Sequence, residues 1–401
     1  MNPNLIETAT PPIPEAADWV SAYDGRLGPL LNMSQAVPGD PPPSEFLQQI
    51  AMAAGTAEAT RYGDIFGDDA LRSAYAAECS RLFGAPIAGE EVAITAGCNQ
   101  AFFLSVMALA AVGDAVLLPA PWYFNHKMTL DMLGIEARVL PLGAENGFIP
   151  SVTEASALID DKVKAIVLVT PNNPTGATYP PELIASFFDL AHAKGIHLIL
   201  DETYRDFRPE GGPPPHGTFA DPRWRDTVIS LYSFSKSFAI PGHRLGALVA
   251  GAPLLSEIGK ILDCLQICPA RAGQMALPWA LTHLKDWRSK TNLEIASRAD
   301  AFRQALAPFP AWRIDQIGAY FAYVRHPFPD IPATIVAERL AKECGLLALP
   351  GNYFGPGQYQ HLRFAFANVD RDTIAQVPKR LAAFPEAASE TSVEWKDNRY
   401  G

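Results

Sequence analysis

Seven short hydrophobic runs recur along the chain, and several of them, such as AIVLV and HLILD, are continuous rather than alternating. Strands that are buried on both faces of a sheet produce continuous runs, because neither face meets water. Helical spacing, as at 181–194, separates most of the runs, and this alternation is typical of an α/β domain. We therefore predict a mostly parallel seven-stranded sheet flanked by helices, with strands at 92–95, 115–119, 136–140, 164–169, 196–200, 227–232 and 245–250.

The segments on either side of this region differ from it. Residues 1–45 are rich in proline and predict an extended arm, and Ser44 predicts an N-cap for the first helix of a large domain over 46–300. We expect residues 301–401 to form, with the arm, a smaller α+β domain that ends in a loose polar tail. Its predicted elements are helices at 296–307 and 333–344 and strands at 319–324 and 362–366.

The composition excludes several functional classes. The formal net charge of −11 disfavours binding to nucleic acid or to an anionic membrane. The longest nearly apolar run, 101–112, is far shorter than the roughly 20 residues of a membrane span, and the N-terminus lacks the features of a signal peptide. The five cysteines are odd in number and scattered, so we expect a cytoplasmic protein. Cys264 and Cys268 would share a helix face, but we favour structural roles over a metal site.

Polar residues follow the ends of the predicted strands, where ligands bind in α/β sheets. The strand at 92–95 leads into Gly97, Cys98 and Asn99 and then into an apolar helix. A glycine permits a tight turn, and the free N–H groups at a helix start suit a phosphate, although an ordinary strand-to-helix turn has the same pattern. The strand at 164–169 ends in PNNPTG, a rigid turn that presents an asparagine.

Two further strand ends carry charged groups. The strand at 196–200 runs into Asp201 of the motif DETY, and a carboxylate that follows five apolar residues needs a cationic or hydrogen-bonding partner. The strand at 227–232 runs into SFSKSF, where Lys236 lies among hydroxyl-bearing and aromatic residues, and Arg244 follows in GHRLG. A solvated surface lysine fits this setting poorly.

The motifs PNNPTG, DETY, SFSKSF and GHRLG, in this order, resemble the aspartate aminotransferase superfamily of pyridoxal-phosphate (PLP) enzymes, fold type I. The resemblance covers about residues 20–385 and includes the segments NMSQAVPGDPPP and LRFAFAN. It implies PLP as cofactor, Lys236 as its Schiff-base lysine and Asp201 as the carboxylate that pairs with the pyridine nitrogen. His126 resembles the histidine that supports this aspartate, with a helix-surface residue as the alternative. Such a lysine needs a pKa lowered from about 10.4 toward roughly 7–8.

The resemblance also assigns the groups around the cofactor ring. Tyr204 and Asn173 correspond to the donors to its phenolic oxygen. Thr203 would lie against one face of the ring. Tyr123 would stack on the other face, with Trp122 as the competing choice. We accordingly expect Lys236, Asp201 and Tyr204 to be the catalytic residues.

The implied phosphate site combines backbone N–H groups, hydroxyls and a guanidinium, whose planar fork bonds two phosphate oxygens. Tyr62 corresponds to a tyrosine that reaches the phosphate from the neighbouring subunit, which implies a homodimer with shared active sites. Arg363, in LRFAF, corresponds to the arginine that binds the substrate α-carboxylate, with Asn173 and Ala36 beside it. The predicted phosphate ligands of the chain itself are Gly97, Cys98, Asn99, Ser233, Ser235 and Arg244.

The resemblance departs from the family pattern at the far end of the substrate. Dicarboxylate-specific members use a further arginine from the partner subunit, but the corresponding position here falls near Cys264. Arg271 or Arg26 remains as a substitute, and Ala36 stands where many relatives have glycine. These departures predict a neutral or aromatic donor rather than aspartate.

The expected activity is ping-pong transamination between an α-amino acid and a 2-keto acid. A lyase, decarboxylase or oxidase on the same scaffold is the alternative, because the scaffold supports several PLP reactions. A PLP-binding transcription regulator is disfavoured, since the net charge is −11 and the short arm leaves no room for a DNA-binding domain.

Overall fold

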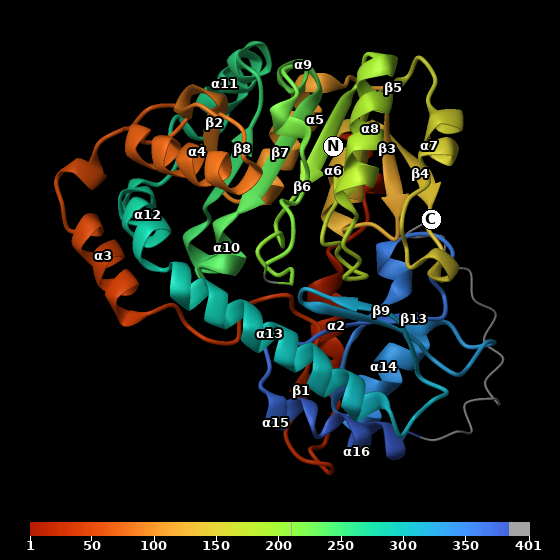
Figure 1. The fold of residues 1–401 in the computed structure, drawn as a ribbon. Helices are drawn as coiled ribbons and strands as arrows, with labels where there is room; N and C mark the ends of the chain where they lie inside the picture. Colours follow the sequence, from red (N-terminus) through yellow and green to blue (C-terminus); the bar gives the residue numbers. More distant parts are fainter. Residues whose placement is uncertain (210, 385–401) are drawn as a thin grey trace.

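The computed structural model describes residues 1–209 and 211–384 and has two bodies, each built around its own sheet (Figure 1). The larger body contains a seven-stranded sheet in the order β2-β8-β7-β6-β5-β3-β4. Strand β8 is antiparallel to both of its neighbours, and the other pairs are parallel. This confirms the predicted fold class. The strands are β2 Val92–Thr95, β3 Ala115–Ala120, β4 Glu136–Pro141, β5 Val163–Val169, β6 His197–Asp201, β7 Val228–Ser233 and β8 Gly246–Val249.

The two faces of this sheet enter two different cores, which explains the continuous hydrophobic runs. In β5, Ile166 and Leu168 pack into one core, whereas Val167 and Val169 pack into the other. Both faces are covered by helices, so no residue of these strands needs to be polar. The helices of eight or more residues in this body are α3 Ser44–Ala54, α4 Asp69–Phe83, α5 Cys98–Leu109, α6 Phe124–Leu133, α8 Pro181–Lys194, α11 Ala252–Gln266 and α12 Arg271–His283.

The smaller body contains an antiparallel sheet in the order β12-β13-β10-β9. Its edge strand β9 (Arg313–Gly318) was not predicted, because its residues are mostly half-buried and lack a hydrophobic pattern. Helix α13 (Lys285–Leu306) starts earlier than the predicted helix at 296–307. It runs through residue 300, where we expected the two domains to divide, and that domain boundary stays a prediction. The other elements are β10 Phe321–Arg325, α14 Ala333–Cys344, β11 Leu346–Leu347, β12 Leu349–Pro350, β13 His361–Ala365, α15 Arg371–Ile374 and α16 Val377–Ala382.

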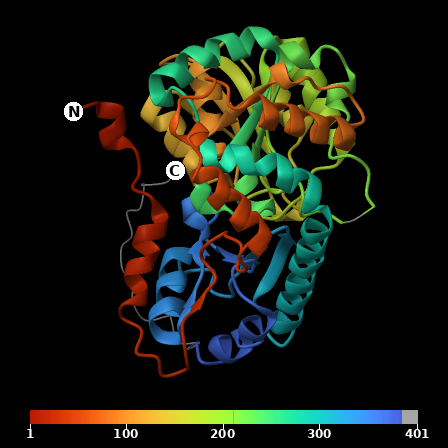
Figure 2. The ribbon, with the colours of Figure 1, turned by 90° about the vertical axis from the view of Figure 1, so that its left-hand side faces the viewer.

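The prediction of an extended N-terminal arm is wrong for its first half. Helices α1 (Pro3–Glu7) and α2 (Pro12–Val20) form there, and each has proline in its first turn, where a missing N–H breaks no hydrogen bond. Strand β1 (Leu31–Asn32) then pairs in parallel with β11 of the smaller body. Figure 2 shows this segment, in red, along one side of both bodies.

Two further expectations concern the ends of elements. Helix α3 begins at Ser44 itself, and Pro43 occupies the cap position, so the predicted N-cap is wrong. The predicted polar tail lies largely beyond residue 384 and outside the described residues. Within the described part of the chain, no helix combines the length and apolar character that a membrane crossing requires.

Candidate active site

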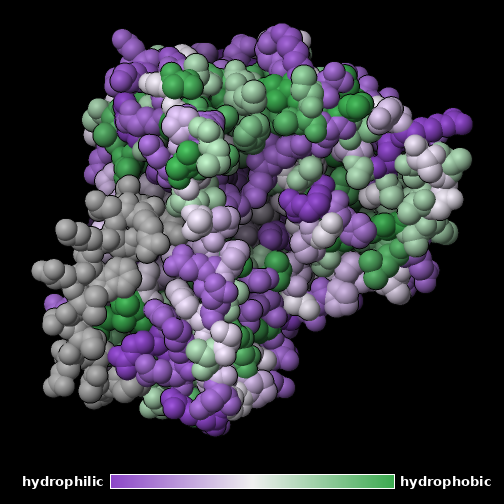
Figure 3. All heavy atoms as spheres, turned by 180° about the vertical axis from the view of Figure 1, so that it is seen from behind, coloured by the Kyte–Doolittle hydropathy of each residue, from purple (hydrophilic) through white to green (hydrophobic). Residues whose placement is uncertain are grey.

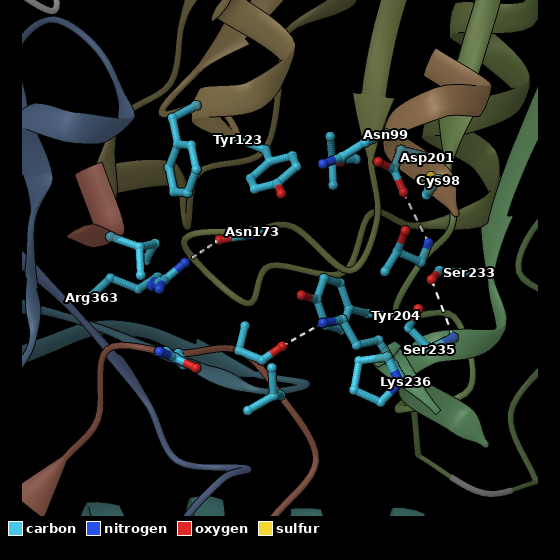
Figure 4. Close-up of a pocket in the computed structure, with 18 of the residues that line it drawn as sticks. Cys98, Asn99, Tyr123, Asn173, Asp201, Tyr204, Ser233, Ser235, Lys236 and Arg363 are labelled. Atoms are coloured by element: carbon cyan, nitrogen blue, oxygen red, sulfur yellow. Dashed lines mark hydrogen bonds between the residues drawn. The ribbon is translucent and has the colours of Figure 1, made fainter. Parts of the chain in front are cut away.

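The polar strand ends of the larger body meet the arm and the smaller body at one cavity of about 320 Å³ (Figure 4). It opens at the carboxyl ends of the parallel strands, where the sequence predicted the site. The predicted residues that line it are Ala36, Cys98, Asn99, Tyr123, Asn173, Asp201, Thr203, Tyr204, Ser233, Ser235, Lys236, Arg244 and Arg363.

Lys236 lies in α10 (Phe234–Ser237), a single helical turn that follows β7. Its Nζ donates to the carbonyl oxygen of Ala36 at 2.5 Å, so the arm passes directly over the lysine. Burial, followed by the positive charges of Arg244 and Arg363, lowers the pKa of Lys236 to about 8. The amine is therefore partly unprotonated near neutral pH, which a nucleophile or a proton carrier requires.

Asp201 ends β6 and is buried, with 4% of its surface exposed. Its Oδ1 accepts the backbone N–H of Thr203 at 3.0 Å, and its Oδ2 lies 3.2 Å from Nε2 of His126. Burial alone would raise the pKa of Asp201, but the hydrogen bond and charge of His126 outweigh it and lower that pKa. The group is thus a carboxylate that can pair with a buried cation.

His126 supports Asp201 rather than lying on a helix surface. It is 1% exposed and stacks on Phe102, with ring centroids 3.9 Å apart. The stack fixes the imidazole plane and aims Nε2 at the carboxylate. The sequence left two alternatives for His126, a partner of Asp201 or a helix-surface residue. The structure favours the partner of Asp201.

Aromatic and hydroxyl groups surround the centre of the cavity. Figure 4 shows the Tyr123 ring facing into it, whereas Trp122 is buried and does not line it. This favours Tyr123 over Trp122 as the stacking residue. Thr203 and Tyr204 reach the cavity from the turn after β6, and burial raises the pKa of Tyr204 well above its usual value. Its hydroxyl therefore stays protonated and can act as a donor.

One end of the cavity has the features of a phosphate site. Gly97, with φ 85° and ψ 172°, turns the chain so that Cys98 and Asn99 open helix α5. The guanidinium of Arg244 crosses this turn, and a Cβ on Gly97 would lie 2.5 Å from its Nη2. Ser235 Oγ is buried and has no hydrogen-bond partner among the described residues, so it can form a hydrogen bond with a ligand. These groups fit the phosphate of PLP.

The opposite end contains the predicted carboxylate site. Arg363 on β13 is 2% exposed; its Nη1 donates to Asn173 Oδ1 at 3.0 Å and its Nη2 to the carbonyl oxygen of Ser34. Burial lowers the pKa of Arg363 to about 10, so the group remains charged at neutral pH. Both partners are neutral, and the positive charge is available to an incoming anion.

Two predicted residues do not line the cavity. Gly97 lies behind Arg244, and Tyr62 is 77% exposed on the surface of the chain. A role for Tyr62 in a neighbouring subunit stays a prediction. Sequence reasoning also missed several lining residues, because apolar or arm residues carry no chemical signal; they are Ile13, Gln35, Val37, Phe124, Val169 and Pro241.

Neither candidate for a distal cation lines the cavity of its own chain. Arg271 pairs with Glu58 at 2.9 Å and with Asp68 at 2.8 Å, away from the cavity. Arg26 donates to the carbonyl oxygen of Glu343 at 2.7 Å.

The two cysteines that suggested a metal pair differ in their surroundings. Cys264 is exposed on α11, whereas Cys268 accepts the N–H of Gly63 at 3.3 Å. Among the described residues, no group of three potential metal ligands is formed.

The half-buried Lys236, the buried Asp201 and the groups around Arg244 line one cavity, as the resemblance to fold type I PLP enzymes implies. The family model for aminotransferase class I and II matches residues 29–381, and the chain belongs to this family of PLP-dependent aminotransferases. It is 26% identical over 336 residues to an aspartate aminotransferase of Sulfolobus acidocaldarius, covering 81% of this chain and 82% of the relative.

A second relative and one solved structure agree. The chain is 28% identical over 385 residues to an arginine–pyruvate transaminase of Pseudomonas aeruginosa, covering 92% of this chain and 95% of that protein. It superposes on a double mutant of Thermus thermophilus aspartate aminotransferase with a TM-score of 0.86 and 23% identity, over 94% of this chain and 98% of the other. This likeness confirms the fold.

Proposed function

We propose that the enzyme transfers the amino group of a neutral or aromatic α-amino acid to a 2-keto acid in a two-step, ping-pong cycle. One observation carries the donor assignment. Among the described residues that line the cavity, the cationic side chains are Lys236, Arg244 and Arg363. The first two lie where the cofactor belongs, so Arg363 remains for the substrate, and it suits the α-carboxylate that every amino acid has.

The surroundings of the donor side chain support a neutral group. Ile13, Val37 and Phe124 line the cavity, and the guanidinium of Arg271 is occupied by two carboxylates elsewhere. A distal carboxylate in such a place would lose its hydration without gaining a partner, which is costly. An apolar or aromatic side chain gains from the same contact.

Bound PLP supplies an aldehyde that condenses with amines and an electron-poor ring that delocalises the charge left at the substrate Cα. Lys236 would hold the cofactor covalently and, once released, would move the Cα proton through its neutral Nζ. Asp201, kept ionised by His126, would keep the pyridine nitrogen protonated. Tyr204 and Asn173 would donate toward the phenolic oxygen, and Tyr123 and Thr203 would restrain the two ring faces.

Binding and orientation of the substrate fall to the junction between the bodies. The remaining N–H groups of Arg363 would bind a carboxylate, and the hydrogen bond to Asn173 orients that guanidinium. Ala36, from the arm, closes the same space. The start of α5, Ser233, Ser235 and Arg244 would hold the phosphate at the other end. The reacting atoms would then lie between two anion sites.

We further propose a homodimer in which Tyr62 reaches the phosphate site of the partner. Exposed apolar side chains lie on the same flank: Leu47 and Met52 of α3 are 43% and 58% exposed. In Figure 3 this flank lies at the right and carries hydrophobic residues among polar ones. Arg271 holds the segment that carries Tyr62 through Glu58. All five cysteines are free, which supports a cytoplasmic location.

A donor panel tests the proposal. Each amino acid is added to the PLP-loaded enzyme without a keto acid, and conversion of the cofactor to its amine form is followed by absorbance. We expect stoichiometric conversion, fastest with neutral or aromatic donors, and recovery only when a keto acid is added. Continuous turnover without any keto acid would contradict transamination and indicate lyase, decarboxylase or oxidase chemistry.

A further inference from the structure

A half-buried carboxylate next to the active site, Asp206, whose side chain is 20% exposed, has no part in the chemistry described so far. Asp206 follows Tyr204 by two residues, in the turn after β6. Its Oδ2 accepts hydrogen bonds from Ser237 Oγ and from Tyr232 OH, both at 2.5 Å. Tyr232 OH and Ser237 Oγ are themselves 2.7 Å apart, so three polar groups close a compact triangle.

Ser237 connects this triangle to the cofactor lysine. It is the residue after Lys236 and the last of α10, a helix of only four residues. So short a helix has little hydrogen bonding of its own to hold it in place. Ser237 is 2% exposed, and its hydroxyl is therefore a buried anchor on the peptide that carries Lys236.

The other oxygen of Asp206 is held from the opposite side. Arg288 Nη2 donates to Asp206 Oδ1 at 2.9 Å, and Arg288 Nη1 donates to Glu78 Oε1 at 2.9 Å. Arg288 belongs to α13, which runs from the larger body to the smaller one (Figure 1). Burial would raise the pKa of Asp206, but Arg288 and then Arg205 lower it to about 2. The Asp206 side chain is therefore a negatively charged carboxylate at neutral pH.

We propose that Asp206 is a positioning residue that holds the turn of Lys236 in register with the turn that carries Asp201 and Tyr204. The inference rests on the proposed role of Lys236 as the cofactor lysine. A lysine that holds the cofactor and moves a proton must be placed within roughly 0.5 Å of its productive position. Asp206 ties the two turns together through one side chain, and Arg288 prevents that side chain from rotating away.

Three variants test the hydrogen bond between Ser237 and Asp206. Ser237→Ala removes the hydroxyl and leaves every charge in place. Asp206→Asn removes the charge, and the double variant measures whether the two act through one interaction. Ser230→Ala is the matched control. Ser230 lies in β7, the strand that leads to α10 and Lys236, and its hydroxyl likewise donates to a carboxylate, that of Glu202, at 2.6 Å.

Two readouts separate positioning from general stability. The first is the rate constant for the donor half-reaction of the PLP-loaded enzyme, with its KM. The second is the pH midpoint for covalent PLP uptake by the apoenzyme, measured by borohydride trapping. We expect Ser237→Ala to lower the rate constant by roughly 10- to 100-fold, with a smaller change in KM. We also expect its midpoint to rise from about 8 toward that of free lysine, because a loosened turn exposes Nζ.

The Ser230→Ala control and the double variant decide the outcome. Ser230→Ala should lose thermal stability while keeping the rate constant and the midpoint. The double variant should be no slower than the slower single variant, because effects through one shared bond do not add. Additive effects, or a Ser237→Ala enzyme that behaves like Ser230→Ala, would overturn the inference. If Asp206→Asn fails to fold, Ser237→Ala still decides. A borohydride label on a different lysine would instead reject the proposed role of Lys236.

Discussion

Replacement of Gly97 by alanine perturbs the turn that Arg244 crosses at the predicted phosphate site. With φ 85° and ψ 172°, Gly97 occupies a backbone region that is nearly restricted to glycine. An added Cβ would lie 2.5 Å from Nη2 of Arg244, which is closer than any ordinary contact, and 3.1 Å from its Cζ, which is tight. The guanidinium must therefore leave its position, since the backbone of the turn is fixed by β2 and α5.

The two effects of this substitution are separable in size and in kind. The backbone strain should lower the free energy of unfolding of the apoprotein by about 1–3 kcal/mol. Displacement of Arg244 should remove a charge-assisted hydrogen bond to the phosphate, worth roughly 1.5–3 kcal/mol. Since about 1.4 kcal/mol corresponds to a factor of ten, the Kd for PLP should rise roughly 10- to 100-fold.

Titration of the apoprotein with PLP and urea unfolding measure the two effects. Gly84→Ala is the matched control: Gly84 has φ +64° at the end of α4, and a Cβ there would meet nothing within 4 Å. It should cost about 1–2 kcal/mol of stability and leave the Kd unchanged. A Gly97→Ala protein that binds PLP as tightly as the parent would refute the role of Arg244 at the phosphate.

The remaining predictions concern the reacting groups. Lys236→Ala should bind PLP without a covalent bond and turn over at background rate; a borohydride adduct that persists would point to another lysine. Because the pKa of Lys236 is lowered to about 8, covalent uptake of PLP by the apoenzyme should accelerate as pH rises through about 8, rather than near 10.4. Asp201→Asn should slow removal of the Cα proton far more than it weakens PLP binding; equal losses would indicate a structural role. Arg363→Ala should lower kcat/KM roughly 100-fold for every donor, whereas Arg271→Ala should leave the order of donors unchanged. Highest kcat/KM with aspartate, abolished by Arg271→Ala, would contradict the proposed pocket.

The site itself was predictable to the extent that it lies at strand ends. Asp201 and Lys236 each follow a buried strand, and parallel strands bring such ends to one edge of the sheet. The hydrophobic runs were equally clear, because both faces of β3, β5, β6 and β7 are buried almost throughout. The half-buried strand β9 has no such pattern in its sequence. The prolines near the N-terminus predicted an extended arm, although they lie in the first turns of two helices.

The sequence alone thus determined the central sheet, the family and the chemical groups of the cofactor site, because these depend on local patterns and ordered motifs. Only the tertiary structure decided which groups meet across the two bodies. Arg363 reaches Asn173, 190 residues away, and Lys236 reaches Ala36, 200 residues away. It also decided that Tyr123 rather than Trp122 faces the cavity and that Arg271 is held by carboxylates outside it. Such contacts depend on how separately folded segments pack, and no local pattern of residues records that packing.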